Sequence, residues 1–176
     1  MILIVQSNKM ALLEQEFLEK IEKHKGVIFK ISKMYMDNFD DQNDLYQEII
    51  YQAWKSYSEF LGKSDFSSWL YRTALNTAIV FLKSEKKRSF IHYQSIENLS
   101  VYHESYNDED DRNMKLMYDA IHQLSSIDKA LIFFFLEDFT GKEIARQLGI
   151  TEINVRVKLN RAKAKLKEII EKQKSV

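Results

Sequence analysis

The sequence predicts an all-α fold of two small helical domains joined by an acidic linker, and three observations lead to that prediction. Among its 176 residues there is no proline and there are four glycines, so residues that interrupt helices are scarce. Apolar residues make up 45% of the chain and charged residues 30%, which is typical of a folded protein and excludes a disordered one. Apolar side chains recur at helical spacing along most of the chain, and this periodicity is lost in one acidic segment near the middle.

The first half of the chain predicts three helices. Residues 8–36 form the first, with Gly26 as a candidate bend, and the polar, acidic residues 38–44 are expected to form a turn. Residues 44–61 form the second helix, in which a polar face lies opposite an apolar one. Residues 66–83 form the third and have the clearest pattern, because their apolar side chains repeat at intervals of three and four residues.

The second half predicts a linker and four helices. Residues 89–111 lose the periodicity, and residues 97–111 contain six acidic and no basic side chains. Periodicity returns near Asn113, and we expect a first helix there. Three further helices are expected over residues 127–139, 142–148 and 151–171. The predicted division is therefore a domain over residues 8–88, a linker over 89–112 and a domain over 113–176.

The composition also excludes several classes of protein. The chain has no cysteine, so it forms no disulfide and no thiolate metal site, and we expect it in the cytoplasm. No segment holds the roughly 20 apolar residues of a membrane-spanning helix, and the first ten residues lack the basic start of a secretory signal. The net charge is zero, but residues 140–176 hold ten basic and four acidic side chains. Such segregation of charge indicates more than one kind of partner.

The strongest local motif predicts a helix-turn-helix in the second domain. That motif needs a small residue where its two helices cross, a residue tolerant of positive φ in the turn, and an apolar anchor in the second helix. Ala145, Gly149 and Val155 have the residue types and the spacing for these three roles. Thr151 stands where it would cap the second helix. The pattern therefore favours binding to duplex DNA.

The second helix of this motif carries six cations, which suits a groove lined with phosphates. Side chains early in such a helix face base edges, so Asn154, Arg156 and Lys158 are candidates for the groove floor. Arg161 and the later cations are expected on phosphates. The alternative is a solvated basic helix that only closes a small bundle.

The third helix combines aromatic residues with a cationic tail, a mixture that suits single-stranded nucleic acid because bases stack on the rings. Phe66 and Trp69 lie on the apolar stripe, however, and a place in the core is the alternative for both. Tyr71, Arg72 and Asn76 lie away from the centre of the stripe and are better candidates for the surface.

These residues carry a resemblance to a known family. The strings QNDLYQEIIYQAWKSY and DFSSWLYRTALNTAIVFLKSEKKR resemble region two of bacterial RNA polymerase sigma factors of the extracytoplasmic-function class, within the sigma-70 family. The string LSSIDKALIFFFLEDFTGKEIARQLGITEINVRVKLNRAKAKLK resembles their region four. Together the matches span nearly the whole chain in the order of the family. The resemblance implies a sigma factor, which catalyses nothing itself and directs core RNA polymerase to promoters.

The resemblance also implies roles for individual residues. The family docks on core polymerase through a D-L-x-Q-E motif, which is here Asp44, Leu45, Gln47 and Glu48. Helical periodicity independently puts the three polar members on one face. The alternative for the acids is that they complement the dipole at the start of the helix.

The same resemblance implies two sets of DNA contacts. The minus-10 element is read by region two, through Lys63, Phe66, Tyr71, Arg72, Asn76, Lys83, Lys86, Lys87 and Arg88. The minus-35 element is read as duplex by region four, through Thr151, Asn154, Arg156, Lys158 and Arg161.

Three residues depart from the family pattern. Ser125 replaces the usual proline at the start of region four, and it can still cap the helix that follows. Val157 stands where the family often has a small polar residue, and Glu152 in the first turn would repel phosphate. The promoter sequence therefore does not transfer from relatives.

The expected partners are core RNA polymerase, promoter DNA and an anti-sigma factor, with no insertion into membranes. The acidic linker and the apolar helix over residues 127–139 offer surface to an anti-sigma factor, although a core role explains that helix equally well. The four histidines, His24, His92, His103 and His122, are dispersed, so we expect no metal and no cofactor. The alternatives are a helix-turn-helix regulator that does not bind polymerase as a sigma factor, and a helical protein–protein adaptor.

Overall fold

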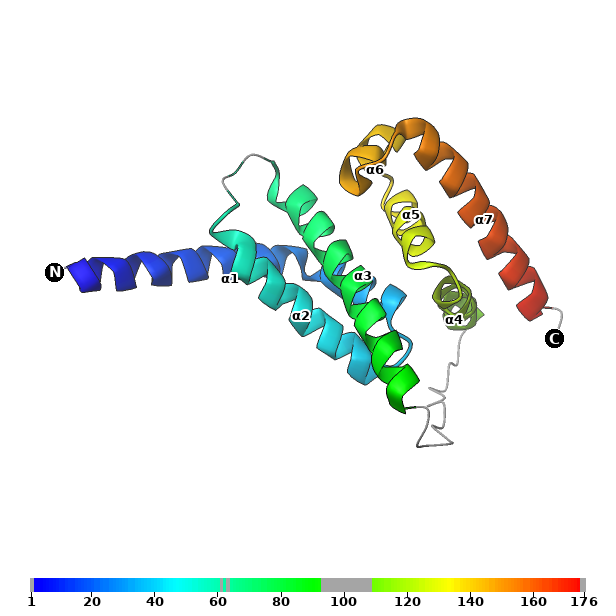
Figure 1. Cartoon of the computed structure of the whole chain (residues 1–176), viewed down its shortest axis with the longest axis horizontal. Helices are drawn as coiled ribbons and strands as arrows, with labels where there is room; N and C mark the ends of the chain where they lie inside the picture. Colours follow the sequence, from blue (N-terminus) through cyan, green and yellow to red (C-terminus); the bar gives the residue numbers. More distant parts are fainter. Residues whose placement is uncertain (1, 61, 63, 93–108, 175–176) are drawn as a thin grey trace.

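The computed structural model describes residues 2–60, 62, 64–92 and 109–174, and within these ranges it contains helices and no strand. The all-α prediction is therefore confirmed. The helices are α1 (Ile2–Tyr35), α2 (Phe39–Tyr57), α3 (Phe66–His92), α4 (Glu109–His122), α5 (Ser126–Leu136), α6 (Gly141–Leu148) and α7 (Glu152–Lys174). Helices α1–α3, here called the amino-terminal lobe, lie on one side of the molecule, and α4–α7, the carboxyl-terminal lobe, lie on the other (Figure 1).

The start of α2 differs from the prediction, because residues 38–44 do not form a turn. Asn38 caps the helix: its side-chain oxygen accepts a hydrogen bond from the Asp41 N–H at 2.8 Å. Asp40 and Asp41 occupy the first turn, where acidic side chains complement the positive end of the helix dipole. The polar, acidic residues that suggested a turn are thus the start signal of α2.

The other helix ends differ from the prediction at the linker and in α1, α2, α5 and α7: α5 ends at Leu136 and not at residue 139, and α7 continues to Lys174. Helix α1 begins earlier than expected and runs through Gly26 as one helix, and α2 ends at Tyr57, where Ser58 caps it. Helix α3 continues past residue 83 to His92, and α4 begins at Glu109. Both ends of the predicted linker are therefore helical, and its residues 93–108 lie outside the described part of the chain.

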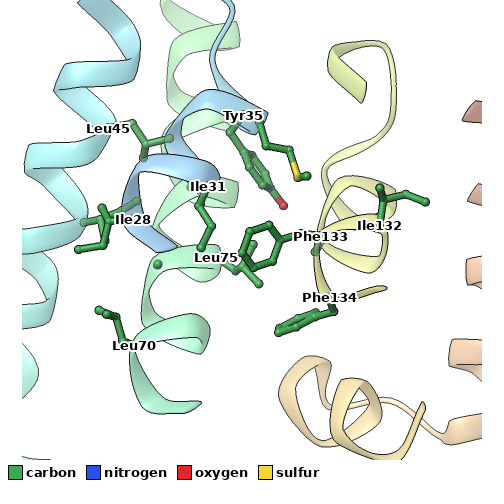
Figure 2. Close-up of a cluster of buried hydrophobic side chains, with 14 of the residues drawn as sticks. Ile28, Ile31, Tyr35, Leu45, Leu70, Leu75, Ile132, Phe133 and Phe134 are labelled. Carbon is green, nitrogen blue, oxygen red and sulfur yellow. The ribbon is translucent and has the colours of Figure 1, made fainter. Parts of the chain in front are cut away.

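One continuous set of buried side chains connects the two lobes. Ile31 of α1 and Leu75 of α3 are fully or almost fully buried, as are Phe133 and Phe134 of α5. Figure 2 shows the two phenylalanine rings projecting from α5 toward the side of α1 and α3 that carries Ile31 and Leu75. The same apolar helix that completes the carboxyl-terminal lobe therefore also packs against the amino-terminal lobe.

Polar groups border this contact between the lobes. The Tyr35 hydroxyl donates to the Ser126 carbonyl oxygen at 2.7 Å, and the Tyr71 hydroxyl donates to Oε2 of Glu137 at 3.2 Å. The Lys30 ammonium lies 2.6 Å from Oε1 of the same carboxylate. Glu137, just after α5, thus binds one residue of α1 and one of α3 at once.

A histidine makes a second polar link between the lobes. In α4, Nε2 of His122 lies 2.8 Å from the Lys33 carbonyl oxygen, and Nδ1 lies 3.0 Å from a carboxylate oxygen of Asp37. The two ring nitrogens of His122 thus connect α4 to the last turn of α1 and to the segment that follows it.

Tyrosines at the contact between the lobes are held in the protonated form. Burial, with a further contribution from the Glu137 carboxylate, raises the pKa of Tyr71 to about 12. Burial also raises the pKa values of Tyr35 and Tyr118 above their ordinary value. A raised tyrosine pKa favours the folded state up to the ordinary value of about 10, and this contribution is lost as the pH rises through the folded-state value.

We therefore expect alkali to weaken the packing of the lobes. The free energy of unfolding in urea, measured from pH 9 to pH 12, should fall more steeply for the wild type than for Tyr71→Phe, which has no proton to lose. Tyr51→Phe, which changes an exposed tyrosine of α2, is the matched control and should follow the wild type. Parallel curves for the wild type and Tyr71→Phe would contradict the assignment.

Candidate functional site

The helix-turn-helix has the geometry that its sequence predicts. Helix α6 begins with a reciprocal cap, in which the Glu143 N–H donates to Oγ1 of Thr140 and the Thr140 N–H donates to the Glu143 carboxylate. Gly149 ends the helix with φ 66°, the left-handed conformation that glycine adopts without strain. Ala145 and Val155 are buried where α6 and α7 meet. All three predicted roles are confirmed.

Helix α7 starts with the predicted cap. The Asn154 N–H donates to Oγ1 of Thr151 at 3.2 Å, so the threonine hydroxyl holds the first turn in place while it remains exposed. Asn154, Arg156 and Lys158 are also exposed. The start of this helix therefore presents its polar side chains to solvent.

The cations of α7 divide into two groups. Within the described part of the chain, Arg156, Lys158 and Arg161 bond no carboxylate and are free for an outside anion. Later cations contact their own chain: the Lys163 ammonium lies 3.2 Å from the ring centre of Phe135. Lys167 and Lys172 form ion pairs with glutamates one turn away. Among the cations of α7 with no ion pair or ring contact in the described residues, Arg156, Lys158 and Arg161 lie in the first half of the helix, and Lys165 and Lys174 lie in the second.

Two apolar residues on this helix were not selected from the sequence. Ile153 and Val157 are exposed, and the helical repeat puts them on the side that faces away from the buried Val155. Val157 was noted only as a departure from the family pattern and Ile153 was not noted, although their spacing relative to Val155 is visible in the sequence.

In α2, the polar residues of the D-L-x-Q-E motif lie at the surface as predicted, but the leucine of the motif does not. Asp44 and Gln47 are exposed, and Glu48, half-buried, accepts a hydrogen bond from Nε2 of Gln52 at 2.8 Å. Leu45 has an exposed fraction of 0% and belongs to the core, so it positions the helix and cannot touch a partner in this structure. Tyr51, which the helical periodicity also puts on this face but which is not part of the motif, is exposed as well.

The helix dipole does not explain the positions of Asp44 and Glu48. Because α2 begins at Phe39, the acids of its first turn are Asp40 and Asp41. Asp44 and Glu48 lie beyond that turn, where the effect of the dipole has fallen off.

Phe66 and Trp69 of α3 lie in an aromatic cluster. Their ring centres are 5.3 Å apart, and the Trp69 ring is 5.0 Å from that of Phe60. Both are half-buried against the core, which favours the alternative of a packing role.

Tyr71 does not lie on the free surface expected for it. Its ring is 5.0 Å from that of Phe139 and 5.8 Å from that of Phe133, and its hydroxyl bonds Glu137. The expectation failed because α3 packs on both lobes, so its buried surface is wider than one apolar stripe. In this arrangement the carboxyl-terminal lobe covers Tyr71.

Three of the remaining residues assigned to the third helix lie on its exposed surface. Arg72, Asn76 and Lys83 are exposed and follow one another at helical spacing. Lys86, Lys87 and Arg88 continue the same helix, α3. Lys63, assigned to the loop before it, lies outside the described residues.

The described residues contain no group of three or more side chains arranged to hold a metal ion. In the same ranges, no helix has the length and apolar character needed to cross a membrane.

Comparison with known protein families gives two matches. Residues 21–88 match the family described as sigma-70 region 2, and residues 114–166 match sigma-70 region 4.

The RNA polymerase sigma factor SigV of Bacillus subtilis is 31% identical over 143 residues, which is 81% of this chain and 83% of the relative. The ECF RNA polymerase sigma-E factor of Haemophilus influenzae is 29% identical over 75% of this chain and 76% of its own length.

Two solved structures resemble the fold. The sigma factor RpoE of Bartonella quintana, in complex with the anti-sigma factor NepR, aligns with a TM-score of 0.67 and 19% identity over 89% of this chain and 98% of that chain. CnrH, in complex with the cytosolic domain of CnrY, aligns with a TM-score of 0.64 and 16% identity over 90% of this chain and 89% of that chain.

The left-handed turn between α6 and α7 can be tested by mutation. Gly149→Ala puts a side chain at φ 66° and should lower the free energy of unfolding by about 1–2 kcal/mol. Gly141→Ala is the matched control: its backbone is ordinary helix and no atom lies within 4 Å of the added carbon, so stability should be unchanged or higher. Urea unfolding of both variants measures the difference, and equal losses would contradict the role of Gly149.

Proposed function

The chain belongs to the sigma-70 family of RNA polymerase sigma factors, in the extracytoplasmic-function class, and from that membership we propose which of its surfaces bind polymerase and which bind the promoter. It is a transcription initiation factor with regions two and four. The proposed division is residues 8–88 for region two, 89–112 for the linker and 113–176 for region four.

The polar face of α2 is the proposed docking site for core polymerase. Asp44 and Gln47 are exposed on it and Glu48 is half-buried, while Leu45 beneath them holds the helix to the core. A rigid helix that presents acids away from its own first turn suits a basic partner surface. The surface proposal rests first on this observation, together with the match of the segment to sigma-70 region 2.

The exposed face of α7 is the proposed minus-35 reader. Its unpaired cations, Arg156, Lys158 and Arg161, follow a capped first turn, which is how a recognition helix enters the major groove. Arg72, Asn76 and Lys83 on α3 are the proposed contacts to the minus-10 strand, together with Lys86, Lys87 and Arg88. Tyr71 joins them only if the lobes separate, since the carboxyl-terminal lobe covers it here.

The remaining expectations are proposals as well. We propose that the chain has no catalytic activity and no cofactor, that it acts in the cytoplasm, and that an anti-sigma protein regulates it. The last is supported by the similar structure of RpoE, which was solved with the anti-sigma factor NepR. Residues Phe135 and Leu136 of α5 are exposed apolar side chains that such a protein could cover.

Charge reversal on α2 tests the docking face. Glu48→Lys should weaken binding to purified core polymerase about tenfold, because it places like charges together at the contact. Glu59→Lys makes the same change on an exposed residue beyond the end of α2 and should leave the affinity unchanged. Binding is measured with labelled full-length protein at fixed, low salt. If both variants bind as the wild type does, this face is not the docking site.

Removal of one cation tests the minus-35 reader. In transcription with core polymerase on genomic fragments, Arg156→Ala should reduce initiation about tenfold or more, the worth of one good base contact. Its affinity for core polymerase should not change. Lys172→Ala, at the far end of α7, removes a cation already paired with Glu168 and serves as the control. Unchanged start sites and yields with Arg156→Ala would overturn the assignment.

A further inference from the structure

The centre of the exposed face of α7 is apolar. Ile153 has an exposed fraction of 67% and Val157 of 40%, whereas Val155 between them is 1% exposed. At 3.6 residues per turn, Ile153 and Val157 each lie about 160° around the axis from Val155, on either side of the point that faces directly outward. Over residues 152–163 these two side chains point farthest from the buried side of the helix, and the exposed Asn160 follows at about 140°.

The polar candidates lie to the sides of this pair. By the same helical repeat, Asn154 and Arg161 lie on one flank, about 100° and about 120° from Val155, and Arg156 lies on the other flank at about 100°. Long side chains on the flanks of a helix in a groove reach the phosphates and the outer base edges. The side chains at the centre of the outward face meet the floor of the groove.

An apolar side chain at the floor of the major groove restricts which base it can recognise. In the major groove each base edge offers hydrogen-bond donors or acceptors, and the thymine C5-methyl is the apolar group among them. A branched aliphatic side chain against a guanine, adenine or cytosine edge would take water from polar atoms and return no hydrogen bond. Against a thymine methyl the same side chain buries apolar surface on both partners.

The nearby surface does not give another explanation for both residues. Ile153 borders a groove of about 490 Å³ together with Phe135 and Phe139, and a protein partner could fill that groove. Val157 does not line it. A partner that fills the groove would therefore cover Ile153 alone of the pair, whereas a ligand on the outward face, which Arg156 and Arg161 flank, would contact both.

We propose that Ile153 and Val157 are specificity-determining residues that read thymine methyl groups in the minus-35 element. The two positions are about 6 Å apart along the helix axis, so the methyls they contact fall within about two base-pair steps. The inference rests on the proposed function of α7 as the minus-35 reader. The inference adds that the minus-35 element must have thymines, on either strand, at the base pairs that Ile153 and Val157 contact.

The test replaces each thymine of the mapped minus-35 element with deoxyuridine, which lacks the methyl group and keeps every hydrogen-bonding atom. Transcription and promoter binding are measured with core polymerase and the full-length chain. For the wild type, substitution at the contacted positions should lower promoter affinity about fourfold per methyl, the worth of one buried methyl group. In Ile153→Ala and in Val157→Ala, deoxyuridine at the one position that the missing side chain contacts should no longer lower promoter affinity. Substitution at that position should therefore add nothing to the loss that the alanine variant already shows.

Controls separate this inference from the proposed function. Leu12→Ala changes an aliphatic side chain that is 69% exposed on α1, and it should keep the deoxyuridine sensitivity of the wild type. If scrambling the minus-35 element abolishes transcription but no deoxyuridine has an effect, the methyl reading is overturned and the minus-35 reader stands. The same holds if the alanine variants keep full sensitivity. If scrambling the element has no effect either, the proposed function of α7 fails with it.

Discussion

The burial of one short helix, α5, is the constraint on which the rest of the structure depends. Leu131, Ile132, Phe133 and Phe134 are all almost fully buried, which a helix achieves only when neighbours cover nearly its whole surface. Helix α7 covers one side, and α1 and α3 cover the other. The carboxyl-terminal lobe therefore does not complete its packing alone, and the position of the recognition helix is tied to the amino-terminal lobe through α5.

Most of the fold follows from patterns within a few residues. Helical spacing predicts where α1, α2, α3 and the carboxyl-terminal helices run, and the roles of Ala145, Gly149 and Val155 follow from steric demands that are local to a helix-turn-helix. The start of α2 was missed for a local reason too. Asn38 and the acids after it are compatible with both a turn and a cap, and the choice depends on whether the Asp41 N–H meets the Asn38 side chain.

The differences in exposure at individual site residues have another origin, since they depend on contacts between elements distant in the sequence. Tyr71 lies away from the centre of the stripe of α3, yet Phe139 and Glu137 cover it from 66 to 68 residues farther along the chain. Leu45 belongs to a motif that resembles a docking site, but only three of the four motif residues reach solvent. A motif match assigns a segment to a surface, whereas burial decides which of its side chains can touch a partner.

The contact between the lobes also sets a condition on any partner that separates them. Separation would expose Phe133 and Phe134 and would break the bonds of Glu137 to Lys30 and Tyr71. Fully burying one large apolar side chain is worth about 1.5–3 kcal/mol, so the loss is several kcal/mol. A partner shifts such an equilibrium only by binding the separated form more tightly than the closed form. A partner that separates the lobes must therefore gain at least this much binding free energy from contacts that only the separated form offers, and the face of α5 that carries Phe133 and Phe134 is one surface that separation would expose.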